Sequence, residues 1–451
     1  MTNDMIATGH QALNNNDGKK SSSSLSNEHR RVLGGAMVGT TIEWFDFFIY
    51  AQAAGLIFAT QYFNPATNQS PSLAQIIAWA SLGISFLFRP IGAIIAGHLG
   101  DKLGRKPVLV LTLLGMGGAT FAMGLLPNYA AIGIAAPILL VLLRILQGLS
   151  AGGEWGGAAL IAVEHAPVNK RGYFGAFPQV GVPAGMALAT VFMLVVTTVL
   201  SPEQFETWGW RIPFLSSLLL IGIGFWIRSL VEESPVFAEM DELKKTASAS
   251  LSTLFTKHSK LVILCAVIFA GCNAAGYLAI AYFASYGTSV LKMERPTVLA
   301  LTLLTALAWI VATLIAGKVS DVIGRRQTFI IGYSAMIIWA IPMWLLIDTA
   351  NVVLFGIGVV VLGLFLGITY GPQPSLYAEM FPASVRLSGL SIGYALGSII
   401  GGAFAPMIAE LILDSTGKSI NIGIYIALIS AASLIAVLMV PKGIQGKSLH
   451  D

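Results

Sequence analysis

The chain has 451 residues, of which 55% are hydrophobic and only 11% are charged, whereas soluble domains carry roughly 25% charged residues. This composition excludes an ordinary soluble domain and predicts an all-α membrane protein. The formal net charge of +4 is not gathered on one soluble stretch, so the charge gives no reason to expect a nucleic-acid partner.

The first 33 residues are polar and include four consecutive serines, Ser21 to Ser24. They lack the apolar core of a cleavable signal peptide. Their composition is typical of a disordered segment. We therefore expect residues 1–33 to form a disordered cytosolic tail.

About twelve apolar runs follow the tail, each offering the approximately 20 residues that a helix needs to cross a bilayer. The predicted spans are 34–60, 73–97, 107–126, 132–163, 173–200, 211–230, 261–286, 297–317, 327–347, 351–377, 387–413 and 421–441. The longest polar interval after the tail, residues 231–260, lies between the sixth and seventh spans. The sequence thus predicts twelve transmembrane helices in two six-helix bundles, 34–230 and 261–441, joined by a cytosolic linker, with a second cytosolic tail at 442–451.

The distribution of lysine and arginine predicts the orientation of these spans. Most of the 26 basic residues fall in segments that share one side with the N-terminus, and such an excess marks the cytosolic side. Only Arg211, Lys292, Arg295 and Lys418 fall in the opposite loops. We expect both termini in the cytosol and the chain in the plasma (inner) membrane.

Two patterns occur once in each half. After the second span, Gly97, Asp101, Gly104 and Arg105 return at the same spacing as Gly317, Asp321, Gly324 and Arg325. After the fourth span, Glu164, Pro167 and Arg171 return as Glu379, Pro382 and Arg386. Parallel repeats of this kind are the plan of a transporter that rocks around a central site.

The repeated charges could serve only to fix topology, but that role does not explain the matched aspartates and glycines. An acid beside a short turn can meet a helix N-terminus or an arginine across the inner mouth. We therefore predict a gating latch that forms when this mouth closes. Its members are Asp101, Arg105, Glu164, Arg171, Asp321, Arg325, Glu379 and Arg386.

Ionisable residues inside membrane spans are costly and usually face the bundle interior. The first half contains Glu43, Asp46, Arg89, Arg144 and Glu154. These three acids and two arginines leave one acid without an embedded cation, and such an acid can exchange protons. We expect Asp46 or Glu154 to carry the proton, with the other in a charge network with Arg144, and give Glu43 a weaker claim. A purely structural ion pair is the alternative for each acid.

A guanidinium group matches the geometry of a carboxylate, so Arg89 or Arg144 could bind an anionic substrate. Packing or snorkelling at the span end is the alternative for Arg89. In the second half, Asn273 and Tyr277 lie four residues apart near mid-membrane, which makes them the best substrate contacts there. Glu410 is the main embedded charge of that half, about a turn from the outer end of the eleventh span.

Nothing in the sequence indicates a cofactor or an enzyme. The glycine runs lack the lysine and hydroxyl residue of a nucleotide-binding loop. All six histidines fall in predicted loops, tails or span ends, and Cys265 and Cys272 have no metal-like spacing. We expect no metal and no catalytic site.

Several motifs carry a likeness to a known family. The loop "GHLGDKLGRK" resembles the signature of the major facilitator superfamily, and "IEWFDFFIY", "FLFRPIGAIIAGHLGD", "LLRILQGLSAGGEWGGAALIAVE", "WGWRIPFL" and "AEMFPASVRLSGLSIGY" resemble its metabolite:proton symporter family. That family includes carriers of shikimate, 2-oxoglutarate, and proline or betaine. Phe45 departs from the pattern, because many members have tyrosine there.

The resemblance implies a monomeric, proton-coupled symporter that imports a small organic carboxylate by alternating access. It also places Arg144 at the membrane arginine of the superfamily's fourth span. Residues 142–215 look closest to shikimate-type carriers, which makes a shikimate-like acid the first expectation, followed by 2-oxoglutarate or another dicarboxylate. A proline/betaine-type osmolyte symporter and a sugar or polyol porter are the alternatives.

Overall fold

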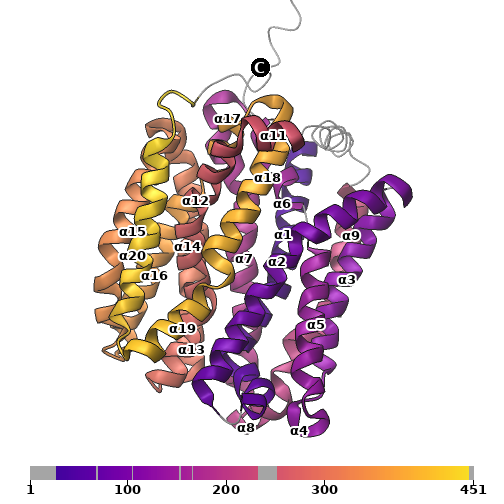
Figure 1. Cartoon of the computed structure of the whole chain (residues 1–451), viewed down its shortest axis with the longest axis vertical. Coiled ribbons are helices and arrows are strands. Elements are labelled where there is room, and N and C mark those ends of the chain that lie inside the picture. The colour runs from indigo at the N-terminus through magenta and orange to yellow at the C-terminus, as the bar shows by residue number, and fades with distance from the viewer. Residues whose placement is uncertain are drawn as a thin grey trace, which may run out of the picture.

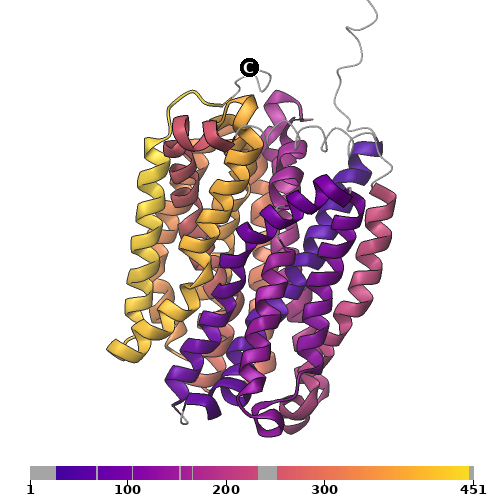
Figure 2. The same ribbon diagram turned by 45° about the vertical axis from the view of Figure 1, so that its right-hand side comes forward.

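The computed structural model describes residues 27–67, 70–103, 105–151, 154–164, 166–231 and 251–445. Within these ranges every regular element is helical. Most of the predicted N-terminal tail and linker, and residues 446–451, lie outside them. Figures 1 and 2 show long, nearly parallel helices, with the first half of the chain beside the second.

The helices of the first half follow in chain order. They are α1 (Asn27–Ala53), η2 (Ala54–Phe63), η3 (Pro65–Thr67), α2 (Pro71–Leu103), α3 (Arg105–Leu125), α4 (Tyr129–Ile132), α5 (Ala135–Ser150), α6 (Glu154–Glu164), η4 (Val168–Lys170), α7 (Arg171–Val199), α8 (Pro202–Gln204), η5 (Phe205–Gly209) and α9 (Arg211–Val231).

The second half continues in the same way. It contains α11 (Leu251–Lys257), α12 (Ser259–Tyr277), η6 (Leu278–Tyr282), α13 (Phe283–Ser285), η7 (Tyr286–Val290), α14 (Arg295–Ile323), α15 (Arg325–Ile347), α16 (Val352–Tyr370), α17 (Gln373–Met380), η8 (Ala383–Val385), α18 (Arg386–Gly397), η9 (Ser398–Ala403), α19 (Ala405–Thr416) and α20 (Ile420–Met439).

Every predicted apolar run is helical in the structure. Among the described residues, nine helices are long and apolar enough to span a membrane. The third predicted span corresponds to α3, the fourth begins with the shorter helix α5, and the sixth begins with the second helix of a pair bent by 48°, Pro202–Gly209 and Arg211–Trp226. The fourth span differs from the prediction, because α5 and α6 are separate helices.

Helical structure also reaches into two segments for which the sequence predicts none. The helix of the first span begins at Asn27, inside the predicted tail, and α11 lies inside the predicted linker. Both segments are polar, and hydropathy locates only the part of a helix that lies in lipid.

The outward faces of the helices are apolar. Val199, Ile338 and Ile94 expose 75%, 74% and 73% of their surfaces, and dozens of other large apolar side chains are exposed as well. A soluble monomer does not expose apolar surface on this scale. The exposed faces therefore fit contact with lipid.

The molecule has two distinct ends along the helix axes. The tail end, at the top in Figure 1, carries α11, α17 and the segment that ends at Gln445. The far end carries α4, α8, α13 and α19. Several helices are π-helical within their apolar runs, at η2, η6, η7 and η9, and such segments are frequent at functional sites.

Candidate functional site

At the tail end, ion pairs cross from one half of the chain to the other. The Arg386 guanidinium donates to Glu164 at 3.1 Å, and Arg171 lies 3.8 Å from Glu379. Each pair joins one member of the first repeat to the opposite member of the second. The sequence-predicted residues therefore meet reciprocally, and we call Glu164, Arg171, Asp321, Arg325, Glu379 and Arg386 the tail-end latch.

Asp321 contacts the other half through a helix terminus. Its two carboxylate oxygens accept the backbone N–H groups of Gly172 and Tyr173 at 2.8 and 2.9 Å. These groups belong to the first turn of α7, where N–H groups lack intrahelical partners and a negative charge is favoured. Arg325 holds the same carboxylate at 2.7 Å and lies 3.6 Å from Glu379, so the latch is continuous.

The backbones of α7 and α14 approach closely beside this carboxylate. A Cβ added to Gly317 would lie 2.6 Å from the Ala176 Cβ and 2.7 Å from the Gly172 carbonyl oxygen. Only glycine leaves room for such an approach. The tail end of the molecule is therefore closed between these helices.

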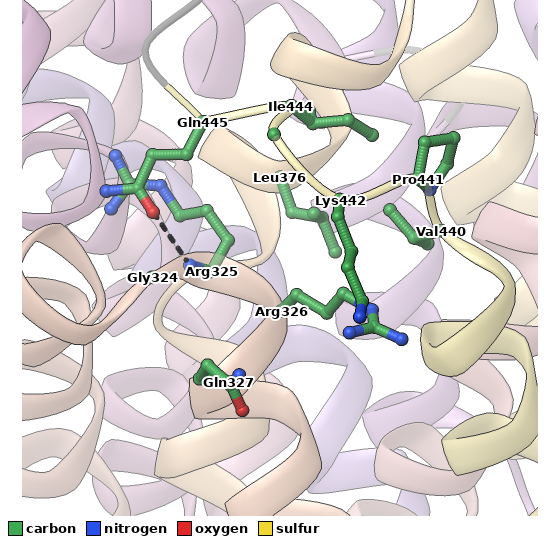
Figure 3. Close-up of a pocket in the computed structure, with 11 residues that line it drawn as sticks. Gly324, Arg325, Arg326, Gln327, Leu376, Val440, Pro441, Lys442, Ile444 and Gln445 are labelled. Carbon is green, nitrogen blue, oxygen red and sulfur yellow. Dashed lines mark hydrogen bonds between the residues drawn. The ribbon is translucent and has the colours of Figure 1, made fainter.

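The segment after α20 folds back over the same turn (Figure 3). The Gln445 side chain accepts the Arg325 backbone N–H at 3.2 Å and donates to the Asp321 carbonyl at 3.1 Å. Between these residues Gly324 has φ +102°, a conformation that favours glycine. A pocket of about 320 Å³ lies beside this contact, lined by Arg326, Lys442 and others, and it is remote from the charges buried inside the first half.

Below the latch, aromatic rings from both halves stack on one another. The ring centres of Trp155 (α6) and Tyr394 (α18) lie 3.7 Å apart, and the two ring planes differ by only 14°. Tyr394 stacks in turn on Phe269 at 4.5 Å, and Phe269 on Tyr370 at 6.1 Å. This aromatic stack forms a second layer of closure across the interface.

Two buried glutamines cross the interface at the same depth. Gln179 of α7 accepts the Trp155 indole N–H at 2.8 Å. Its amide donates to the Gln373 side chain at 3.0 Å and to the Tyr370 carbonyl at 3.1 Å. Sequence reasoning missed Gln179 and Trp155 as interface residues, although an amide inside an apolar span was a usable signal.

A central cavity lies beneath the aromatic stack, between the halves. Asn273 and Tyr277, the predicted substrate contacts, both line it. The other lining residues are Trp44, Phe48, Val182, Phe269, Cys272, Gly276, Ile280, Trp309, Tyr370 and Tyr394. The cavity measures only about 10 Å³, room for at most one water molecule, so the halves must move apart to admit a substrate.

Arg89 reaches the wall of this cavity through a cage of rings. Its guanidinium carbon lies 4.1 Å from the centre of the Phe47 ring, 4.8 Å from Phe86 and 5.0 Å from Trp44. Phe86 also packs edge-on against Tyr277 at 5.4 Å. Among the described residues, the buried Nε and one terminal nitrogen of Arg89 have no hydrogen-bond partner.

Arg144 is fully buried and contacts the same Phe47 ring. Its guanidinium carbon lies 4.5 Å from the Phe47 centre and 4.2 Å from the Tyr50 centre. The guanidinium donates to the Gln147 side chain and, at 3.3 Å, to the Leu82 carbonyl. In the described part of the chain it forms no ion pair.

Asp46 is buried, with 2% of its surface exposed, whereas Glu43 on the same helix is half-buried. Its carboxylate accepts the Ser217 hydroxyl of α9 at 2.6 Å. Gln147 separates it from Arg144, because the Gln147 amide donates to Thr120 at 2.9 Å and approaches the Asp46 carbonyl at 3.4 Å. No lysine or arginine of the described residues pairs with this acid.

The remaining predicted residues divide into one that is described and three that are not. Glu43 is half-buried on α1, on the side nearer Tyr277 and Tyr394. Asp101, Arg105 and Glu154 belong to α2, α3 and α6, but their side chains lie outside the described part of the structure. The latch therefore has six described members, and Asp46 and Glu43 are the described candidates for the proton.

The far end is closed as well. Arg295 and Glu206, one from each half, form an ion pair at 3.0 Å. Nearer the centre, a Cβ on Gly83 would lie 2.6 Å from the Ala403 carbonyl oxygen, so α2 and η9 touch. With both ends shut, the structure is an occluded form around the central cavity.

Comparison with known proteins gives a consistent result along the whole chain. The sequence model described as Major Facilitator Superfamily matches residues 36–406. The chain is 39% identical to an Escherichia coli K12 protein named inner membrane metabolite transport protein YhjE, over 92% of this chain and 94% of the relative.

Two further relatives carry more specific names. The chain is 35% identical to the shikimate transporter of Escherichia coli K12, over 92% of this chain and 95% of the relative. It is 34% identical to a putative proline/betaine transporter of Staphylococcus haemolyticus, over 91% and 87%. Among solved structures, a D-xylose-proton symporter superposes with a TM-score of 0.73 at 17% identity, covering 93% of this chain and 99% of that one.

Proposed function

Because the chain belongs to the major facilitator superfamily, we propose that it is a proton-coupled symporter that imports a small organic carboxylate by alternating access. Its relatives already show that the protein is a multi-pass membrane transporter of metabolites and not an enzyme. The proposal adds two finer elements, the coupled proton and the carboxylate substrate.

The observation that carries the proposal is a pair of charges inside the helices, the half-buried Arg89 and the buried Asp46, for which the described residues supply no ionic partner. Arg89 keeps free N–H groups beside a cavity whose described lining holds no charge. Asp46 has a hydroxyl partner but no cation among the described residues. An unpaired buried charge is costly, so both sites favour a state in which something neutralises them.

Substrate and proton are suited to do so together. A substrate carboxylate would accept from Arg89, and a proton would neutralise Asp46. The empty carrier then holds one charge of each sign at these sites, and the loaded carrier holds neither. A half-loaded carrier keeps one charge unbalanced, which makes its passage through the occluded form unfavourable and couples the two fluxes.

Arg144 links the two sites. It contacts Phe47, as Arg89 does, and it donates to Gln147, whose amide donates to the Thr120 hydroxyl and approaches the backbone carbonyl of Asp46. Because Thr120 also approaches the Asp46 carboxyl group, protonation of Asp46 can change the position of Arg144 and of the ring that supports Arg89. Glu43 and Glu154 remain further candidates for proton coupling, with Asp46 preferred because it is buried without a cation.

We assign the tail end to the cytosol, in the inner membrane, because most basic residues of the chain fall on that side. The tail-end latch, with Asp101 and Arg105 as its expected counterparts in the first half, then closes the inner mouth. It opens when the loaded carrier releases its substrate inside.

Uptake of radiolabelled shikimate into cells that lack their own carrier tests the proposal. Expression of this chain should give accumulation that collapses with a protonophore. Unlabelled 2-oxoglutarate and other carboxylates serve as competitors to define the class. Accumulation that persists without a proton gradient would contradict the coupling.

A second candidate substrate is favoured by one observation. Seven aromatic residues line the central cavity, namely Trp44, Phe48, Phe269, Tyr277, Trp309, Tyr370 and Tyr394. Aromatic cages bind quaternary ammonium groups, and a betaine offers such a group together with a carboxylate for Arg89. Uptake that betaine or proline inhibits, and shikimate does not, would favour an osmolyte carrier.

A further inference from the structure

A second buried acid lies at the far end, away from Asp46 and the tail-end latch. Glu410 of α19 is half-buried. Its carboxylate faces Tyr282 of η6 and Trp79 of α2, and the rings of Trp79 and Tyr282 lie 6.2 Å apart. Glu410 and Tyr282 belong to the second half of the chain and Trp79 to the first, so this cluster spans the interface.

Trp79 is part of the far-end closure. A Cβ on Gly55 would lie 2.6 Å from the Trp79 ring and 2.9 Å from the Ser285 Cβ. The Ser285 hydroxyl donates to the Gly55 carbonyl at 3.2 Å, across the two halves. Any separation of the halves at the far end must therefore move Trp79 away from Ser285 and from Glu410.

The two hydrogen-bond donors near Glu410 have no other acceptor among the described residues. The Trp79 indole N–H and the Tyr282 hydroxyl are buried and reach no full hydrogen bond within the described residues. The neighbouring Tyr286 hydroxyl is already occupied, because it donates to Asp348 at 2.7 Å. Buried donors without partners are costly, which leaves Glu410 as the acceptor that both can approach.

The charged neighbours of Glu410 do not neutralise it. Asp414, one turn further along α19, is another acid. The facing groups on the other elements are Tyr282 and Trp79, and no described lysine or arginine forms an ion pair with Glu410. An ionised carboxylate is thus favoured when water reaches it and disfavoured when the far end closes.

We propose that Glu410 is a proton-sensing residue of the far-end gate, which closes over Glu410 once this residue has taken up a proton. Closure removes water from the carboxyl group, so closure and proton uptake favour each other. A low pH at the far side therefore stabilises the closed gate, and a high pH stabilises the open one. This inference rests on the proposed proton-coupled cycle, but not on the identity of the substrate.

Cysteine accessibility tests the gate without any substrate. The Ser285→Cys variant places a buried thiol at the contact of Gly55 with Trp79 and residue 285, where a membrane-impermeant maleimide reaches it only through an open far end. The same thiol is measured with and without Glu410→Gln, so that the ratio of the two labelling rates cancels the pH dependence of thiol chemistry. The chain without Ser285→Cys gives the background from Cys265 and Cys272, both buried.

The expected ratio changes with pH. At alkaline pH the chain with ionised Glu410 should be labelled about tenfold faster than the Glu410→Gln chain, because the charge shifts the gate equilibrium toward the open form by about tenfold. At acidic pH the labelling rates of the two chains should converge. Asp414→Asn, a matched loss of an acid on the same helix, should leave the pH-dependent change in place. Trp79→Phe, which removes the indole N–H donor and shortens the ring, should speed labelling at acidic pH.

A ratio that stays constant across pH would overturn the proposal. If Glu410→Gln does not reach the membrane, Glu410→Asp replaces it. The ratio of the labelling rates of the Glu410 and Glu410→Asp chains should then change with pH, because the two carboxyl groups take up a proton at different pH; a ratio constant across pH would also overturn the proposal. Failure of the uptake assay would leave this result untouched, because labelling requires no transported molecule.

Discussion

At the scale of single residues, the partner of a buried charge distinguishes its possible roles. Arg386 and Arg325 are buried but satisfied by acids of the latch. Arg89 rests on aromatic rings, and Asp46 on the Ser217 hydroxyl. A satisfied ion pair holds elements together, whereas a charge without a counter-charge can respond to a ligand or a proton.

Asp46→Asn should abolish accumulation against a gradient. The amide keeps the size of the side chain and a contact with Ser217 but cannot take up a proton. Exchange of labelled for unlabelled substrate across the membrane should continue, because exchange needs no net proton movement. Uptake and exchange measured on the same vesicles separate these two effects.

Ser217→Ala provides the control for Asp46. It removes one hydrogen bond, of about 1 kcal/mol, and leaves the titrating group in place. Accumulation should therefore persist at a reduced rate. Full accumulation in Asp46→Asn would exclude Asp46 as the proton carrier and direct attention to Glu154 and Glu43.

Arg89→Ala should raise the KM for a carboxylate substrate by about tenfold to a hundredfold, the loss of a charged hydrogen bond. Arg89→Lys keeps the positive charge but not the planar guanidinium group, so its KM should lie between the KM of the unmodified protein and that of Arg89→Ala. Competition curves with the labelled substrate measure both. An unchanged KM in Arg89→Ala would assign Arg89 a packing role only, with Arg144 left as the substrate-binding arginine.

The residue types of the site could be predicted from the sequence, but not their partners. Charged residues inside apolar runs identify Asp46, Arg89 and Arg144 directly. The contact of Asp46 with Ser217 joins residues 171 positions apart, and no local pattern encodes such a distance. The choice between a free and a paired acid is therefore beyond sequence reasoning.

At the scale of elements, α7 and α14 approach closely at the tail end. Asp321 binds the first turn of α7, and Gly172 faces Gly317 beside it. The apolar runs predict both helices, because burial in lipid requires long apolar segments. The break between α5 and α6 and the π-helical turns are not predicted, because hydropathy does not register changes in backbone hydrogen bonding.

Gly317→Val should prevent the tail end from closing. A side chain there collides with Ala176 and with the Gly172 carbonyl, so the tail end stays open and uptake falls by at least about tenfold. Gly222→Val is the matched control, because a Cβ at Gly222 meets nothing within 4 Å. Equal uptake by both variants, at equal protein levels in the membrane, would show that this contact is not required.

At the scale of the whole molecule, two ion pairs tie the halves reciprocally at the tail end. Glu164 pairs with Arg386 and Glu379 with Arg171. The repeated motifs predict which residues lie at the mouth, because parallel repeats bring equivalent loops to the same side. They do not predict that each glutamate pairs with the arginine of the other half, because this pairing depends on how the two bundles are rotated against each other.

Exchanging the charges of one pair tests its role in closure. Glu164→Arg or Arg386→Glu alone should reduce uptake and thermal stability, because each places like charges together. The double variant should recover part of both, with a coupling energy of about 1 kcal/mol in a double-mutant cycle. Additive losses would indicate that the pair does not act as a latch.

The reciprocal pairing has a consequence for the origin of the fold. Each half carries a glutamate and an arginine at corresponding positions, and each residue finds its opposite on the other half. An interface in which residue i meets j and j meets i is the isologous contact of a symmetric homodimer. A single six-helix ancestor with this self-complementary patch pairs with its own copy and forms both ion pairs. Fusion of two gene copies then keeps these pairs, and the rest of the two halves is free to diverge.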